Sequence, residues 1–122
     1  MKSGLTERDV RTIWEILARH PEIRRVNLFG SRASGHCALG SDIDLAVMND
    51  GVTERLMAKI LSEFEESSLP YFVDFINYPT LTHHKLKEQI EQSGVEFYAA
   101  EHQNSHYDKE ADDEMAKREK KR

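Results

Sequence analysis

The feature that constrains this chain most is the order of its apolar segments, which alternate between helical and strand periodicity. Helical spacing marks three segments, namely residues 6–19, residues 53–64 and a stretch around Leu86 and Ile90. Strand-like runs lie between them, at residues 25–29, 41–48 and 71–76. Such alternation predicts an α/β or α+β fold, a sheet with helices packed on it, in the order helix, strand, loop, strand, helix, strand, helix.

Turn and cap residues set the ends of these segments. Thr6 and Asp9 have the spacing of a capping box, and Pro21 is expected to end the first helix shortly before it. Gly94 is expected to stop the last helix, and residues 95–98 form a final apolar patch.

The composition changes sharply after Ala100. Residues 101–122 hold seven acidic and six basic residues and very little apolar material. A segment with so little surface to bury does not order itself alone. We therefore expect a folded domain over residues 1–100 and a charged tail over residues 101–122, either disordered or a helix that needs a partner.

Charge, cysteine content and hydropathy exclude several classes of protein. A net charge of −5 argues against nucleic acid as a direct ligand, because bulk electrostatic attraction to phosphates is missing. The single cysteine, Cys37, excludes an intramolecular disulfide and suits a reducing cytoplasm. No segment approaches the ~18 apolar residues of a membrane span, and the N-terminus does not look like a signal peptide. A cytoplasmic protein without membrane association is expected.

Two acidic residues interrupt the strand at residues 41–48. Ile43, Leu45 and Val47 point to one face of this strand, so Asp42 and Asp44 project together from the other. Their Cα atoms are expected to lie about 6.6 Å apart, at roughly 3.3 Å per residue.

A third acidic residue, Asp74, lies inside the apolar run 71–76. If the two strands are neighbours, its carboxylate joins those of Asp42 and Asp44 from less than about 5 Å away. Two such charges 4 Å apart repel by about 1 kcal/mol in water and by about 4 kcal/mol at an effective dielectric of 20. A cation would relieve that repulsion, and carboxylate oxygens favour Mg²⁺ or Mn²⁺. The three aspartates are therefore the candidate metal ligands and catalytic residues.

A candidate phosphate site precedes this strand. Gly30 lets the backbone approach a phosphate, the Ser31 hydroxyl adds a donor, and Arg32 adds a charged fork. Each element has an ordinary alternative when taken alone. Asp-x-Asp is common in acidic proteins, Gly-Ser-Arg is usually only a turn, and Asp74 could protect an edge strand from aggregation. Their occurrence in this order, each in its expected strand context, favours a site that transfers a nucleotidyl group.

These residues also carry a resemblance. The pattern Gly-Ser, ten residues, Asp-Ile-Asp resembles the signature of polymerase-β-like nucleotidyltransferases. More closely, LFGSRASG at residues 28–35, followed by SDIDL at residues 41–45, resembles the minimal nucleotidyltransferases of bacteria and archaea. The resemblance covers about residues 5–98. One departure is Ser34, where members often carry arginine or lysine.

The resemblance implies a small mixed sheet with helices on one side, ATP as donor and Mg²⁺ as metal. Asp42 and Asp44 would bind both metal ions, and Asp74 would complete the site and help to activate the acceptor. The nucleotide would be held by the matching positions of the motif, Gly30, Ser31, Arg32 and Ser41.

The resemblance also implies a partner. Many members are encoded beside a helical HEPN protein and act as antitoxins by attaching AMP to a tyrosine of that toxin. We further expect exposed surface near Phe97 and Tyr98 to help hold a protein acceptor together with the tail. Both a homodimer and a hetero-oligomer with the partner stay open.

Two other functions stay open beside this one. The chain could neutralise its partner by complex formation alone, although the intact set of Asp42, Asp44 and Asp74 speaks against a decayed site. It could also transfer a nucleotidyl group to a small molecule. Enzymes of that kind usually carry a second domain for the acceptor, for which 122 residues leave no room.

Overall fold

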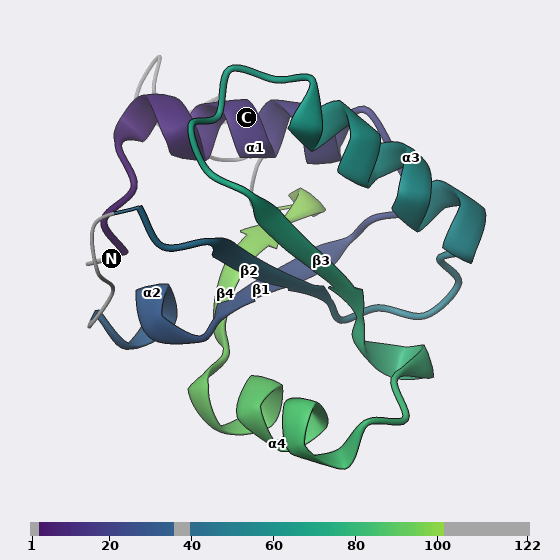
Figure 1. Ribbon diagram of the computed structural model, residues 1–122. Helices are drawn as coiled ribbons and strands as arrows, with labels where there is room; N and C mark the ends of the chain where they lie inside the picture. The colour runs from purple at the N-terminus through teal and green to yellow at the C-terminus, as the bar shows by residue number, and fades with distance from the viewer. Residues whose placement is uncertain (1–2, 36–39, 102–122) are drawn as a thin grey trace, which may run out of the picture.

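The fold is built on one four-stranded sheet (Figure 1). The computed structural model describes residues 3–35 and 40–101. The spatial order of the strands is β3-β2-β1-β4, with bounds β1 Arg25–Phe29, β2 Ile43–Val47, β3 Val73–Asn77 and β4 Val95–Ala99. β1 pairs antiparallel with both β2 and β4, whereas β2 and β3 run parallel. The sheet is therefore mixed, as the family resemblance implied.

Four α-helices and one 3₁₀ turn complete the described chain, namely α1 Glu7–Ala18, α2 Ser31–Ser34, α3 Glu54–Glu65, η1 Tyr78–Thr80 and α4 His84–Ser93. The expected capping box is confirmed, because the Asp9 N–H donates to Thr6 Oγ1 and the Thr6 N–H to the Asp9 carboxylate. Thr53 caps α3 with its side chain alone, since its hydroxyl accepts a hydrogen bond from the Leu56 N–H. None of the helices in the described residues is long and apolar enough to cross a membrane.

Helices cover both faces of the sheet. α1 and α3 lie together on one face, and α4 lies on the other (Figure 1). The main core between the sheet and α1/α3 contains Ile13, Leu17, Leu28, Ile43, Leu45 and Phe64, among others. On the opposite face, Phe29 and Ala46 pack against Ile90 of α4. The expectation of helices on one side alone was therefore wrong, since Ala46 and Phe29 also need apolar cover.

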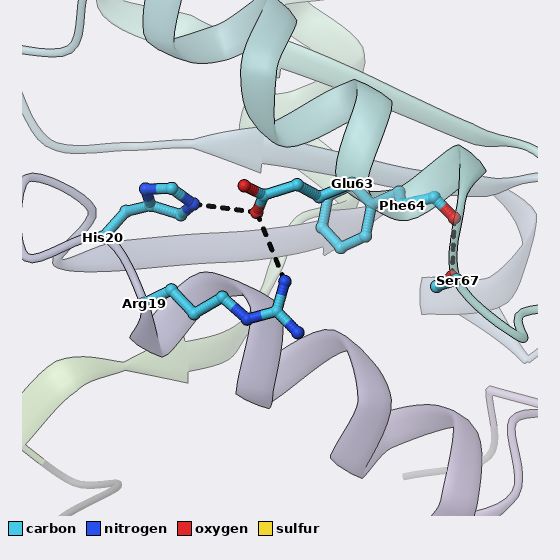
Figure 2. A network of polar contacts seen from close by, with 5 residues as sticks. All are labelled: Arg19, His20, Glu63, Phe64 and Ser67. Atoms are coloured by element: carbon cyan, nitrogen blue, oxygen red, sulfur yellow. Dashed lines mark hydrogen bonds and ion pairs between the residues drawn. The ribbon is translucent and has the colours of Figure 1, made fainter.

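A salt bridge network joins the two helices of the first face (Figure 2). His20, just after α1, contacts Glu63 of α3 with 2.8 Å between Nε2 and Oε1. Arg19 adds a longer ion pair to the same carboxylate at 3.6 Å. The hydrogen bond from His20 lowers the pKa of Glu63 below its ordinary value. This contact fixes the end of α1 against α3.

The strands differ from the expected runs at both ends of β2 and of β3, and a fourth strand is added. β2 is shorter than the run 41–48 at both ends, whereas β3 begins two residues later than the run 71–76 and ends one residue later, because the ladder runs from Ile43–Val73 to Val47–Asn77. The apolar patch after α4 is a fourth strand, β4, in which Phe97 and Tyr98 are buried at 6% and 3% exposure. They are therefore not the exposed docking surface that we expected. The predicted tail, apart from Glu101, and Cys37 lie outside the described residues.

Gly94 ends α4, but not through a left-handed cap. Its φ of −69° is accessible to any residue. A side chain is excluded instead by space, since a Cβ at Gly94 would overlap the carbonyl oxygen of Ile90. The glycine therefore lets the chain turn directly from α4 into β4.

Candidate active site

Two of the predicted carboxylates meet where β2 and β3 begin. The two strands run parallel with Asp44 opposite Asp74, and the Ile43 N–H donates to the Phe72 carbonyl at 2.9 Å. Because side chains alternate along a strand, Asp44 lies on the same face as Ala46, which packs towards α4. The Asp74 carboxyl group lies near enough to act on the pKa of Asp44, both as a hydrogen-bonding neighbour and through its charge.

The environment of Asp44 disfavours its ionised form. Partial burial, the hydrogen bond to Asp74 and the charges of Asp74 and Asp42 together raise the pKa of Asp44 to about 6. Only the Arg32 guanidinium acts in the opposite direction. Two adjacent carboxyl groups without a cation relieve their repulsion by holding a proton. A cation bound beside these carboxyl groups would therefore favour the ionised form of Asp44.

Asp42 belongs to the same surroundings but not to this pair. It precedes β2, its side chain is exposed, and it acts on Asp44 through its charge. Within residues 3–35 and 40–101, no three carboxylate, imidazole or thiol side chains form a group that could hold a metal ion. The donor set fits Mg²⁺ or Mn²⁺ chemically, since all three groups are hard oxygen ligands and a bound cation would relieve the repulsion between them. A three-ligand metal site stays a prediction.

Gly30 brings the candidate phosphate turn directly against Asp44. Its backbone has φ +77° and ψ −156°, a conformation that only glycine adopts readily. A Cβ at this position would overlap the Asp44 carboxylate. The turn after β1 and the metal-ligand candidate on β2 are thus in contact, although fourteen positions separate them in sequence.

The serines expected at the nucleotide lie around this turn. Ser31 begins α2 and is exposed, and its carbonyl accepts a hydrogen bond from Ser34 Oγ at 2.9 Å. Ser41 is half-buried, and its carbonyl accepts from the Arg32 guanidinium at 2.6 Å. Gly30, Ser31 and Ser41 therefore stay candidates for nucleotide contacts, with Ser31 the most accessible hydroxyl.

Arg32 is placed differently from the sequence expectation. Its side chain is only 2% exposed and donates to the backbone carbonyls of Ser3, Ser41 and Asp42. A guanidinium so engaged has little surface to offer a phosphate. The sequence could not signal this, because burial of Arg32 depends on segments far apart along the chain.

Sequence reasoning also missed Ser93, in the last turn of α4. Its hydroxyl accepts a hydrogen bond from the Gly30 N–H at 3.3 Å and donates to the Gln89 carbonyl at 2.7 Å. The C-terminal end of α4 is thereby tied to the candidate phosphate turn. A serine near a helix end carries no sequence signal for such a contact.

Comparison with known proteins identifies the family. Residues 11–103 match the family described as Polymerase beta, Nucleotidyltransferase. The match covers well over half of the chain, so this protein belongs to the polymerase β nucleotidyltransferase family. The expectation of a nucleotidyltransferase with this fold is thereby confirmed. A comparison with curated protein sequences finds no significant relative.

Solved structures share the fold at low sequence identity. One is a toxin-antitoxin with AMP-PNP, 22% identical, with a TM-score of 0.61 over 88% of this chain and 99% of that chain. A second is a tri-AMPylated Shewanella oneidensis HEPN toxin in complex with MNT antitoxin, 18% identical, with a TM-score of 0.55 over 83% and 78%. A third is the toxin-antitoxin MntA-HepT, 21% identical, with a TM-score of 0.51 over 91% and 100%.

Proposed function

We propose that this chain is the antitoxin of a toxin-antitoxin pair and that it transfers AMP from ATP to a HEPN-type protein, with Mg²⁺ or Mn²⁺ as metal. The observation that carries this proposal is the contact between the Gly30 turn and the Asp44–Asp74 pair, within a nucleotidyltransferase fold. That contact brings a candidate phosphate site and hard oxygen ligands together. The AMP-PNP, HEPN toxin and MNT antitoxin named for the structural relatives support this nucleotide and this partner.

Each of the candidate site residues has its own role in the proposed reaction. Asp42, Asp44 and Asp74 would hold the metal, which would supply positive charge for the triphosphate and its leaving group. Gly30 and Ser31 would bind the phosphates through backbone N–H groups and the Ser31 hydroxyl. An acceptor hydroxyl oxygen would form a bond to the α-phosphorus while the bond to pyrophosphate breaks. Asp74, the exposed member of the Asp44–Asp74 pair, would receive the hydroxyl proton.

A protein acceptor is favoured by the surface beside Asp74. β3 is an edge strand of the sheet, and Phe72, immediately before it, is 78% exposed. The unpaired backbone groups of an edge strand can pair with another chain, and Phe72 adds exposed apolar surface beside that edge. Phe72 thus takes the docking role that we first assigned to the region of Phe97 and Tyr98.

The test uses purified chain, labelled ATP, Mg²⁺ and the HEPN-type protein encoded in the neighbouring gene. Label is expected on that protein, and its toxicity should fall in parallel. Asp44→Asn keeps the shape of the side chain but removes a metal ligand, so transfer should fall by several orders of magnitude while the fold is retained.

The main alternative is neutralisation by binding alone. It predicts that Asp44→Asn still suppresses the toxin at equal concentration and that no label is transferred by the unmodified chain. That combination of results would overturn the catalytic proposal. Labelling of a small molecule in place of the protein would favour the third function, transfer to a small acceptor.

A further inference from the structure

We propose that Arg32 is a positioning residue that holds the starts of β2 and β3 together, and that Tyr71 is its partner in this role. The inference deepens the proposed function, because these two strands carry the candidate metal ligands. It assigns Arg32 to the support of the aspartates rather than to direct contact with the triphosphate.

The first observation is the contact that Arg32 makes before β2. Its Nε lies 3.2 Å from the Ser41 and Asp42 carbonyl oxygens, and Nη2 lies 2.6 Å from Ser41 O. Two consecutive carbonyls are thus bound by one planar group, which fixes the backbone that leads into Asp42 and Asp44. Nη1 donates to the Ser3 carbonyl at 2.9 Å and ties the N-terminal segment to the same point.

The second observation is the contact with the segment before β3. The Arg32 Cζ lies 4.4 Å from the centre of the Tyr71 ring, within the range of a cation–π interaction. Tyr71 is three positions before Asp74. One guanidinium therefore contacts both segments that enter the parallel pair, at the end where the Ile43 N–H and the Phe72 carbonyl form a hydrogen bond.

Burial makes this arrangement specific for arginine. A buried charge is stable only when hydrogen bonds and opposite charge compensate for the lost water. Carbonyl dipoles, the Tyr71 ring and the nearby Asp44 carboxyl provide that compensation for Arg32. Lysine keeps the charge but lacks the planar fork, so it cannot bind two carbonyls and stack on a ring at once.

The test compares Arg32→Lys and Tyr71→Leu with the control Arg55→Lys, an exposed arginine on α3. Three quantities are measured on the full chain, namely Mn²⁺ affinity without nucleotide, ATP affinity without metal, and exchange of the Ile43 amide. Arg32→Lys should weaken Mn²⁺ binding by about 10- to 100-fold, as for other residues that orient metal ligands. Tyr71→Leu should weaken it less, and Tyr71→Phe, which keeps the ring, should restore it. In all these variants, the affinity for ATP without metal should change by less than about threefold, which is the size of effect that one exposed ion pair has.

Amide exchange makes the proposal testable even if the proposed function fails. If the unmodified chain binds neither Mn²⁺ nor ATP, the transferase proposal fails, and the Ile43 amide alone decides the positioning role. Faster exchange in Arg32→Lys and Tyr71→Leu, but not in Arg55→Lys, supports it. A loss of ATP affinity in Arg32→Lys with unchanged Mn²⁺ affinity and unchanged Ile43 exchange would show that Arg32 is a phosphate ligand, and would overturn the proposal.

Discussion

Replacement of Gly30 by alanine separates the geometry of the site from the stability of the fold. At φ +77° and ψ −156°, a residue other than glycine is strained by about 1–3 kcal/mol. The new Cβ would also overlap the Asp44 carboxylate, which is the mobile end of a side chain and can rotate away. The stability loss should therefore stay near 1–3 kcal/mol, below a total of about 5–15 kcal/mol. Rotation would break the Asp44–Asp74 pair, and displacement by about 1 Å can lower a rate about 100-fold.

Gly51→Ala is the matched control for this experiment. Gly51 also has a positive φ, +93°, but a Cβ there meets no atom within 4 Å. Both variants should lose similar free energy of unfolding in urea denaturation, whereas only Gly30→Ala should lose transfer from labelled ATP. The reasoning would be refuted if folded Gly30→Ala transferred AMP at the rate of the unmodified chain.

Three further outcomes are expected. ATP with Mg²⁺ should raise the melting temperature more than ATP alone does. At a ligand concentration of 100 times Kd, binding adds about 2.7 kcal/mol to the free energy of unfolding. Equal melting temperatures with and without Mg²⁺ would speak against the metal site. Phe72→Ser should reduce AMP transfer to the protein partner without changing ATP affinity, and equal transfer would exclude docking at Phe72. The pKa of Glu63 is lowered in the folded state, so its contact with His20 stabilises the protein above the ordinary pKa and loses that effect as pH falls. Glu63→Gln should therefore cost less than about 1 kcal/mol near pH 7, and in pH-dependent denaturation the difference from the unmodified chain should shrink as the pH falls below the ordinary pKa of glutamate, about 4.3.

Local patterns in the sequence predicted most of the elements. The Thr6–Asp9 capping box and the apolar face of the helix after it depend on residues three or four positions apart. They can therefore be predicted without knowledge of the tertiary structure. The alternation around Asp44 predicted β2 and the face of its carboxylate for the same reason. β4 was missed, because three consecutive buried residues, Phe97 to Ala99, do not show the alternation of a half-exposed strand.

The candidate site was only partly predictable, since its residues come from distant segments. The sequence identified Asp42, Asp44 and Asp74 as candidates, provided that the two strands that carry them are neighbours in the sheet. Parallel pairing in the observed register placed Asp44 beside Asp74, and register is decided by packing across the whole sheet. The same packing placed Ser93 on the Gly30 N–H.

Arg32 shows most clearly what the sequence determines and what only the tertiary structure determines. In the sequence, Arg32 follows a glycine turn, and its planar guanidinium group could bind a phosphate through two hydrogen bonds. In the folded chain it lies beneath the turn, bound to carbonyls from Ser3 and Ser41 and stacked on Tyr71. The sequence by itself determined which charges and turns are available, because these depend on residue type and local spacing. Only the tertiary structure decided which charges face solvent and which are buried, because burial depends on contacts between segments far apart in the chain.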